Sequence, residues 1–248
     1  MGNEKVIIVT GGSRGIGSSI VRNLATRGYR VACISRKGQG VEDAEVTPTC
    51  KDLIKAYACD VTDHQAMSKT VEQIASDHSG ICGLVNNAGI HLDGPSVSFE
   101  AEKFSTVLGT NVIGPFVLSQ IIHPYLCEKG GGLIVSIGSF YDRAGVPKNT
   151  AYCASKSAIA AVSRCLAVEW ARDNIRVVNV APGFVETDLN RGYLEKEKFQ
   201  QYLRSRIPMK RPAQSEEVGQ LVGALFSENM PFLTGETIYF DGGQGIQL

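Results

Sequence analysis

The sequence of 248 residues predicts an α/β fold in which helices cover both faces of one doubly wound parallel sheet. Three observations predict this class. Short apolar runs rich in β-branched residues alternate with longer segments of helical periodicity. The first run ends in a glycine-rich turn at residues 11–17, which leads into a helix. No linker or internal repeat divides the chain, and its length suits one core, so we expect a single domain over residues 1–248.

Each predicted strand is a short apolar run, which is the composition of strands buried on both faces of a parallel sheet. The runs lie at residues 6–10, 30–35, 56–60, 83–85, 133–137, 175–180 and 237–240. The predicted helices follow the first turn through Ile20 and Leu24, pass through Val71 and Ile74, and then span 102–126, 151–170 and 215–226. Residues 38–50 indicate a loop or a poorly formed helix, and residues 187–207 are charged and flexible in composition.

The predicted helix 102–126 contains a local defect. Asn111 is a poor helix former, and Gly114-Pro115 shortly after it should disturb the helix. A buried polar side chain at such a defect is either a hydrogen-bonded core residue or a functional one.

Composition limits the partners of the chain. The 25 basic residues balance the 25 acidic ones, so charge gives no indication of binding to nucleic acid or to an anionic membrane. No apolar run reaches the length of a membrane span. The first five residues lead straight into a strand and leave no room for a signal peptide, so we expect a cytoplasmic protein.

Cysteine and histidine patterns argue against a disulfide framework and against a metal site. The seven cysteines are an odd number without C-x-x-C pairs, which is typical of free thiols in a reducing compartment. The four histidines also lack ligand spacing, and we expect no metal.

The glycine turn has the composition of an anion cradle. Gly11, Gly12, Gly15 and Gly17 lie between a buried strand and a helix start. Glycines let the backbone approach a ligand, and the free N–H groups and positive end of the helix then face a pyrophosphate. The alternative is a turn whose glycines are only structural.

The end of the second strand indicates which dinucleotide would bind. An acidic residue at this point would accept hydrogen bonds from a free ribose 2′-hydroxyl, whereas a cation suits a 2′-phosphate. Here Ser35 is followed by Arg36, and Arg14 in the glycine turn offers a second guanidinium. The alternative is an ordinary basic turn in solvent.

Tyr152 and Lys156 are four residues apart, so on a helix both side chains lie on one face, one turn from each other. Ser139 ends a strand thirteen positions earlier and is expected to reach the same pocket. An ammonium about 4 Å from a phenol lowers the phenol pKa by roughly three units from its ordinary value near 10. Tyr152 would then act as a general acid or base near neutral pH. The alternative is an ordinary tyrosine and lysine on a half-exposed helix.

These motifs occur in one order along nearly the whole chain. They are T-G-x-x-x-G-I-G at 10–17, N-N-A-G at 86–89, Asn111, Ser139, Y-x-x-x-K at 152–156 and P-G at 182–183. The order resembles that of the short-chain dehydrogenase/reductase family, which has a Rossmann-like fold. The resemblance implies that Tyr152 is the catalytic acid/base and that Lys156 lowers its pKa and binds the nicotinamide ribose. It also implies that Ser139 orients a substrate carbonyl and that Asn111 holds a water of the proton relay.

The resemblance, together with Arg36, predicts NADP(H) as the cofactor. Asp60 and Val61 would meet the adenine, Asn87 the ribose region, and Val185 and Thr187 the nicotinamide amide. The complete set of predicted cofactor-binding residues is Gly11, Ser13, Arg14, Gly15, Ile16, Gly17, Arg36, Asp60, Val61, Asn87, Gly89, Tyr152, Lys156, Val185 and Thr187.

Within the family, the chain is most similar to the 3-oxoacyl-(acyl-carrier-protein) reductase group, and this likeness is carried by residues 137–139, 180–188 and 234–237. The chain departs from that group at residues 91–98 and 140–148. Such segments shape the substrate pocket, and we expect a substrate loop at about 187–210. An apolar entrance is suggested by Phe140, Tyr141, Phe184, Leu189 and Tyr193, although these side chains would also suit simple packing against a loop.

We therefore expect an NADPH-dependent carbonyl reductase, reversible as an alcohol dehydrogenase, acting on a small-molecule ketone such as a 3-oxoacyl thioester. An oxidative secondary-alcohol or sugar dehydrogenase and a non-catalytic NADP-binding sensor are the alternatives. The resemblance implies a homotetramer, in which the helices 102–126 and 151–170 meet their symmetry mates through Phe104, Val162 and Leu166.

Overall fold

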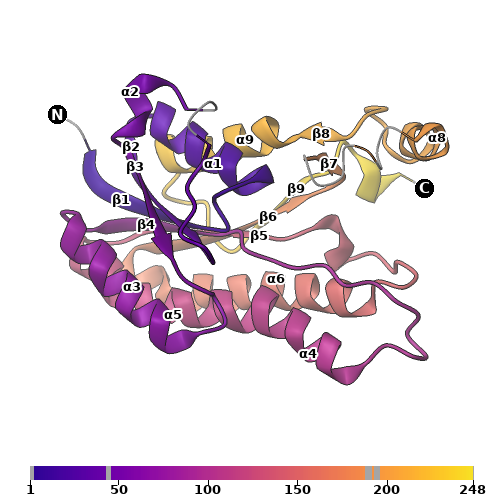
Figure 1. Ribbon diagram of the computed structural model, residues 1–248, viewed down its shortest axis with the longest axis horizontal. Helices are drawn as coiled ribbons and strands as arrows, with labels where there is room; N and C mark the ends of the chain where they lie inside the picture. Colours follow the sequence, from indigo (N-terminus) through magenta and orange to yellow (C-terminus); the bar gives the residue numbers. More distant parts are fainter. Residues whose placement is uncertain (1–2, 43–45, 188–191, 193–195, 248) are drawn as a thin grey trace.

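The computed structural model describes residues 3–42, 46–187, 192 and 196–247. The strands of its main sheet are β1 (Asn3–Thr10), β2 (Tyr29–Ser35), β3 (Ile54–Ala58), β4 (Ile81–Asn86), β5 (Gly132–Ile137), β6 (Ile175–Pro182) and β9 (Thr237–Phe240). They form one seven-stranded sheet in the order β3-β2-β1-β4-β5-β6-β9, and every neighbouring pair is parallel (Figure 1). A small second sheet pairs β7 (Val185–Glu186) with β8 (Ala213–Gln214).

The helices lie on both faces of the sheet, which confirms the predicted doubly wound α/β class (Figure 1). They are α1 (Gly15–Thr26), α2 (Pro48–Lys51), α3 (His64–Asp77), α4 (Ala101–Leu108), α5 (Gly114–Glu128), α6 (Thr150–Trp170), α8 (Glu197–Arg206) and α9 (Ser215–Ser227). Short helical turns are the π-helix η2 (Gly109–Ile113) and the 3-10 turns η3 (Phe140–Asp142), η4 (Ala171–Asp173) and η5 (Gln244–Ile246).

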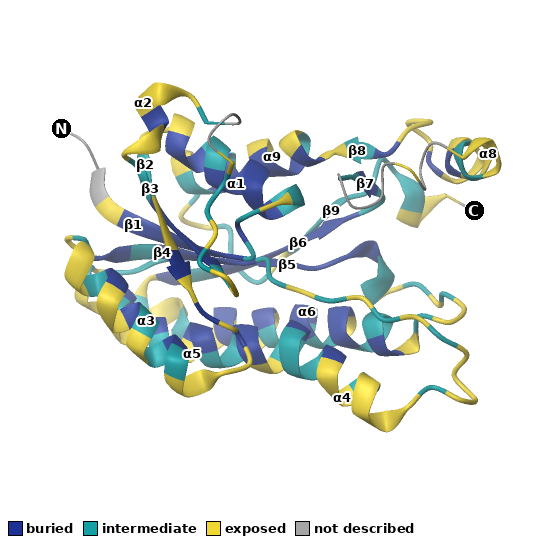
Figure 2. Cartoon of the chain, viewed as in Figure 1, coloured by how far each residue is buried: buried dark blue, intermediate teal, exposed yellow. Residues whose placement is uncertain are grey.

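Successive side chains of a strand point to opposite faces, and β1 therefore feeds two separate cores. Val6 and Ile8 belong to the core that α3, α5 and the end of α6 cover, whereas Ile7 and Val9 belong to the core under α1 and α9. All four side chains are completely buried, and Figure 2 shows the buried layer running through the sheet. This burial on both faces explains why the strand is a continuous apolar run.

The strand order reverses between β1 and β4. From β1 the chain builds outward through β2 to β3, then returns to the other side of β1 and continues through β4, β5, β6 and β9. In open α/β sheets the ligand site lies outside the carboxyl ends of the strands at such a reversal. The glycine turn after β1 and the N-N-A-G segment at the end of β4 both lie at this reversal.

The predicted defect in the long helix is the π-helix η2, which contains Asn111 and separates α4 from α5. A Cβ at Gly114 would lie 2.6 Å from the carbonyl oxygen of Val61, so only glycine permits this close approach. The stretch 101–128 is long and apolar enough to cross a membrane by length and composition, which corrects the expectation that no segment reaches that length. Its residues Leu118 and Ile122 are nonetheless part of the core, as expected for the core helix of a globular fold.

Of three other local predictions, the strand end near residue 60 and the charged segment after 187 need adjustment. Strand β3 ends at Ala58 instead of Asp60, because its partner β2 ends at Ser35 and the register pairs these two residues. Of the segment predicted as a loop or a poorly formed helix, the described residues 38–42 and 46–47 form no helix or strand, and the short helix α2 begins at Pro48. The charged segment predicted to be flexible contains α8, whose Leu203 is fully buried.

Candidate active site

The glycine turn between β1 and α1 has the geometry of an anion cradle. Gly11 and Gly15 adopt φ values of +64° and +55°, which glycine tolerates and other residues rarely adopt. A Cβ at Gly17 would collide with the carbonyl oxygen of Gly11. In the described part of the chain, Arg14 at the N-cap makes no side-chain capping bond, and the first turn of α1 holds no acidic residue. The N–H groups and positive end of α1 are therefore directed at this turn.

Asn87 fixes the glycine turn to the end of β4. Its side-chain amide donates to the carbonyl oxygens of Thr10, at 2.9 Å, and Gly11, at 3.1 Å. The Thr10 hydroxyl in turn accepts from the backbone N–H groups of Asn87 and Ala88, both at 3.0 Å. The side chain predicted to meet the ribose thus also orders the backbone on both sides of the strand reversal.

The end of β2 lies against the same turn. The N–H of Gly11 donates to the carbonyl of Ile34 at 2.8 Å, and Arg36 is exposed two residues further on. The pKa of the Asp60 carboxyl is lowered, chiefly by hydrogen bonds from the backbone and hydroxyl of Thr62 and to a smaller extent by the charge of Arg36. Arg36 and Asp60 therefore lie at the same end of the sheet, as predicted.

A cleft of about 380 Å³ opens at the carboxyl ends of β4, β5 and β6. It brings together eight of the predicted site residues: Ile16, Asn87, Gly89, Ser139, Tyr152, Lys156, Val185 and Thr187. They come from segments spread over 172 residues of sequence, from Ile16 to Thr187. The strand order collects them, because parallel strands all end at the same edge.

Tyr152 and Lys156 lie one turn apart at the start of α6, on the face that lines the cleft. The Lys156 ammonium is 5.4 Å from the centre of the Tyr152 ring. It donates a buried hydrogen bond of 2.8 Å to the carbonyl of Ile137, at the end of β5. The lysine is therefore held beside the tyrosine by the sheet itself.

This geometry contradicts the prediction that Tyr152 titrates near neutral pH. Burial raises the pKa of Tyr152 to about 12, although a hydrogen bond with Ser139 acts in the opposite direction. Burial also lowers the pKa of Lys156 to about 8. The attraction between the two groups favours their charged forms, but taking each charge out of water costs more here, so burial determines the direction of both pKa shifts. In this structure the phenol is a stable proton donor at neutral pH.

Ser139 follows β5 and is positioned by its own turn. Its hydroxyl caps η3 by accepting from the N–H of Tyr141 at 3.3 Å. The same hydroxyl forms the hydrogen bond that lowers the pKa of Tyr152. Two hydroxyl groups therefore meet at one point of the cleft, which is the arrangement needed to bind a carbonyl oxygen from two sides.

Asn111 lies behind the cleft wall and is 3% exposed. Its side chain accepts from the N–H of Ile90 at 2.9 Å and donates to the carbonyl of Ile90 at 2.9 Å and to the hydroxyl of Ser155 at 3.0 Å. Asn111 thus ties the segment after β4 to α6. The predicted role in a water relay stays a prediction, whereas the positioning role follows from these contacts.

Sequence reasoning did not identify His91 as a site residue. Its ring lies 4.6 Å from the ring of Tyr152, and its Nε2 forms a hydrogen bond with Asn149, the N-cap residue of α6. Tyr141 contacts another side of the Tyr152 ring at 5.9 Å. The available signal was a histidine directly after N-N-A-G-I, in the segment that departs from the reductase group.

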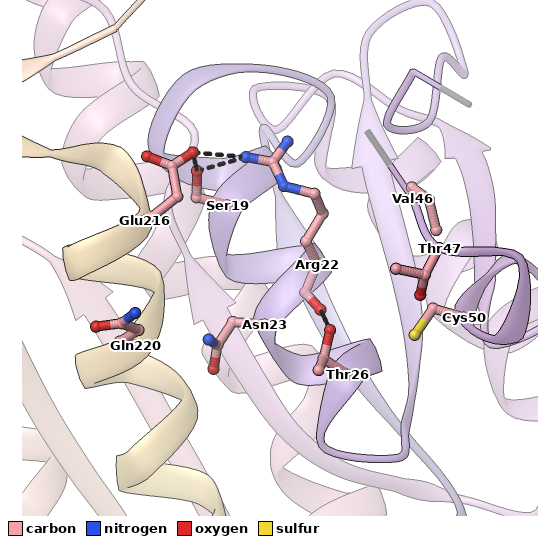
Figure 3. A pocket seen from close by; sticks show the side chains of 9 residues that line it. All are labelled: Ser19, Arg22, Asn23, Thr26, Val46, Thr47, Cys50, Glu216 and Gln220. Atoms are coloured by element: carbon pink, nitrogen blue, oxygen red, sulfur yellow. Dashed lines mark hydrogen bonds and ion pairs between the residues drawn. The ribbon is translucent and has the colours of Figure 1, made fainter. Parts of the chain in front are cut away.

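A second pocket of about 260 Å³ lies between α1, residues 46–50 and α9 (Figure 3). Glu216 joins Arg22 and Ser19 across its rim, at 2.9 and 3.2 Å. None of the predicted catalytic or cofactor-binding residues lines it. The cleft that contains Tyr152 is therefore the candidate active site.

A family model described as enoyl-(acyl carrier protein) reductase matches residues 11–244. Together with the glycine turn and the Tyr152–Lys156 pair, this match shows that the chain belongs to the short-chain dehydrogenase/reductase family of oxidoreductases.

The proteins that are similar to this chain are named for different substrates. The chain is 35% identical to a tropinone reductase homologue of Arabidopsis thaliana, over 96% of this chain and 91% of that protein. It is also 35% identical to the human 3-oxoacyl-[acyl-carrier-protein] reductase, over 97% and 98%. A putative short-chain alcohol dehydrogenase from Sinorhizobium meliloti 1021 superimposes with a TM-score of 0.91 at 33% identity, over 100% of this chain and 98% of that one. A gluconate 5-dehydrogenase from Burkholderia cenocepacia J2315, solved with NADP and tartrate, superimposes with a TM-score of 0.89 at 26% identity, over 100% of this chain and 97% of that one.

Proposed function

We propose that this protein is an NADPH-dependent carbonyl reductase that converts a ketone to a secondary alcohol. The observation that carries the proposal is the meeting of the Tyr152 phenol, the Ser139 hydroxyl and the Lys156 ammonium in one cleft beside the glycine turn. These are the groups needed to hold a carbonyl oxygen and to protonate it. Family membership supports the reaction type.

The chain's own residues handle the proton and the carbonyl. The reduced nicotinamide, when bound, supplies the hydride to the carbonyl carbon. The hydroxyls of Ser139 and Tyr152 donate hydrogen bonds to the carbonyl oxygen, and Tyr152 transfers its proton as negative charge develops there. The nearby Lys156 ammonium stabilises the tyrosinate that remains. A phenol whose pKa is about 12 carries its proton at neutral pH, and this is the form of Tyr152 from which reduction of a carbonyl starts.

The preference for NADPH over NADH rests on Arg36 and Arg14. Both side chains are exposed, and each belongs to a segment joined at the glycine turn by the hydrogen bond between Gly11 and Ile34. A guanidinium pairs with a phosphate in a bidentate way, so these two side chains suit the 2′-phosphate. The similar gluconate 5-dehydrogenase was solved with NADP.

An apolar ketone such as a 3-oxoacyl thioester fits one wall of the cleft. Phe184 contacts Phe140 at 5.7 Å and, on α8, Phe199 at 5.7 Å and Tyr202 at 6.3 Å. This aromatic cluster links the cleft to part of the predicted substrate loop at about 187–210, and gives an acyl chain an apolar surface. The predicted entrance residues Leu189 and Tyr193 lie outside the described residues.

A secondary-alcohol or sugar dehydrogenase that works oxidatively is the second candidate. His91 gives another wall of the cleft a polar side chain, held by a hydrogen bond with Asn149, and this suits a hydroxylated substrate. A similar structure is named as a gluconate 5-dehydrogenase.

A substrate screen separates these candidates. The protein is assayed for NADPH and NADH oxidation with 3-oxoacyl thioesters and simple ketones, and for NADP⁺ and NAD⁺ reduction with secondary alcohols and sugar acids. We expect the highest kcat/KM with NADPH and an apolar ketone. Higher kcat/KM with a sugar acid and an oxidised cofactor would establish the second candidate. Cofactor binding without turnover on any member of the panel would favour the non-catalytic sensor.

We also propose a homotetramer in the cytoplasm, with contacts through α4, α5 and α6. Val168 on α6 is 80% exposed, and Ile113 between α4 and α5 is 48% exposed, so apolar side chains face outward on these helices. Phe104 and Val162 are partly buried and remain candidates for the interface. Leu166 is no longer a candidate for the interface, because it is only 5% exposed and packs in the protein's own core.

A further inference from the structure

Three side chains of metal-ligand type meet on the edge of the sheet opposite the cleft. His123 and Cys127 lie one turn apart on α5, and Asp173 ends η4. Their candidate ligand atoms all lie within 4.8 Å of one another. His123 Nε2 is 3.1 Å from Asp173 Oδ2 and 3.6 Å from Cys127 Sγ.

The fold brings these residues together although 46 positions separate Cys127 from Asp173. Cys127 shortly precedes β5 and Asp173 shortly precedes β6, and these two strands are parallel neighbours. The turns before them are joined by Asn174, whose side chain donates to the carbonyl of Gly130 at 2.8 Å and whose carbonyl accepts from Gly132 at 3.2 Å. The segments that carry the three groups are therefore fixed relative to each other without a ligand.

A small movement of Cys127 would give the three groups the spacing of a tetrahedral site. Zinc–ligand bonds of about 2.3 Å to sulfur and 2.0–2.2 Å to nitrogen or oxygen place neighbouring ligand atoms roughly 3.4–3.6 Å apart. His123 Nε2 is 3.1 Å from Asp173 Oδ2 and 3.6 Å from Cys127 Sγ, which is close to this range. Because Sγ is also 3.7 Å from Nδ1, it lies beside the ring and has to turn toward Nε2 to share an ion with it. The third separation, between Cys127 Sγ and the Asp173 carboxylate, is at most 4.8 Å. Cys127 is exposed, so its side chain is free to rotate about the Cα–Cβ bond toward the other two groups.

The tryptophan of this chain reports on the site. Its indole, at Trp170, contacts the His123 ring with a centroid distance of 4.7 Å. The sequence contains one tryptophan, so its fluorescence measures this environment alone. The contact also restricts the orientation of the His123 ring.

We propose that His123, Cys127 and Asp173 form a binding site for one borderline-soft divalent cation, with Zn²⁺ as the best match to a nitrogen, sulfur and oxygen set. Binding replaces the thiol proton of Cys127, which is released to solvent, and leaves a fourth position for water. The ion joins the end of α5 to the turn after α6. This proposal replaces the sequence-based expectation of no metal, which considered spacing along the chain and not the neighbourhood of β5 and β6.

Titration of the full-length reduced protein with Co²⁺ tests the site. We expect one equivalent per chain to produce a thiolate-to-cobalt charge-transfer band and to quench Trp170 fluorescence, and we expect Zn²⁺ to displace it. Cys127→Ser should remove the charge-transfer band, and His123→Ala should weaken binding at least tenfold. The matched controls are Cys165→Ser, at another exposed free cysteine, and His64→Ala, at an exposed histidine of α3; both should bind Co²⁺ as the unmodified protein does.

Binding by the unmodified protein without saturation near one equivalent would overturn the proposal. So would a charge-transfer band that survives in Cys127→Ser and is lost in Cys165→Ser. Melting curves with and without Zn²⁺ show whether the variants remain folded, and Zn²⁺ should raise the Tm of the unmodified protein and of the two controls more than that of His123→Ala.

Discussion

The buried lysine leads to a specific prediction for the pH dependence of the reduction. The pKa of Lys156 is lowered to about 8, whereas that of Tyr152 is raised to about 12. When the pH of the assay rises from 7 to 9, Lys156 therefore loses its charge while Tyr152 keeps its proton. About nine in ten lysines are charged at pH 7 and about one in ten at pH 9.

If the ammonium stabilises the developing tyrosinate, kcat/KM for NADPH should fall about tenfold over this interval. The fall should follow a single ionisation near pH 8, because kcat/KM for this substrate reports the groups of the free protein. The measurement is kcat/KM for NADPH, taken from initial rates of NADPH oxidation at several NADPH concentrations and a saturating ketone concentration, in buffers of constant ionic strength.

The matched variant is Lys156→Arg, whose guanidinium stays charged throughout the range. It should react more slowly, since the bond to Ile137 is altered, but its profile should be flat near pH 8. A constant kcat/KM of the unmodified protein up to pH 10 would contradict this role of Lys156. A decrease near pH 8 that persists unchanged in Lys156→Arg would contradict it as well.

Three further predictions concern the cofactor, the assembly and the glycine turn. Arg36→Asp should lower the ratio of NADPH to NADH affinity at least tenfold, because a charge-assisted phosphate contact contributes about 1.5–3 kcal/mol. The neighbouring change Lys37→Asp should alter the ratio less. An unaltered ratio in Arg36→Asp would exclude a contact between Arg36 and the 2′-phosphate. Light scattering should give a mass near four times 26.7 kDa, reduced in Val168→Asp, whereas a monomer at micromolar concentration would contradict the tetramer. Gly17→Ala should lower both Tm and cofactor affinity because its methyl group collides with the turn, and Gly40→Ala, where a Cβ has only ordinary contacts, should not; equal effects of the two changes would contradict the steric argument.

The sequence was sufficient for the fold class because buried parallel strands leave a direct signal in composition. Val6 to Val9 are apolar since both faces of β1 are covered, and the same holds along β4, β5 and β6. The break around Asn111 was also predictable, because asparagine and a following Gly-Pro pair disfavour a regular helix. The π-helical form of that break was not, since it depends on bonds to Ile90 and Ser155 in other segments.

Features that depend on three-dimensional neighbours were missed or misjudged. The pKa of Tyr152 is set by how deeply the phenol is buried, which spacing along a helix does not reveal. Leu166 has the same periodicity as an exposed apolar residue but points into the core. His91 lies beside Tyr152 only because the segment after β4 crosses the start of α6. Such contacts join residues far apart in sequence, and no local pattern encodes them.

The central claim is that Tyr152 protonates the carbonyl oxygen. Tyr152→Phe keeps the ring, and with it the contacts to His91 and Tyr141, but removes the hydroxyl. The most direct measurement is the single-turnover rate of NADPH oxidation by this variant on the best ketone, together with its NADPH affinity and Tm. General acid catalysis contributes about 10²–10⁴-fold, so we predict a rate at least 10²-fold lower with the affinity and the Tm preserved. A folded Tyr152→Phe variant that binds NADPH and reacts within a few-fold of the unmodified rate would contradict the mechanism.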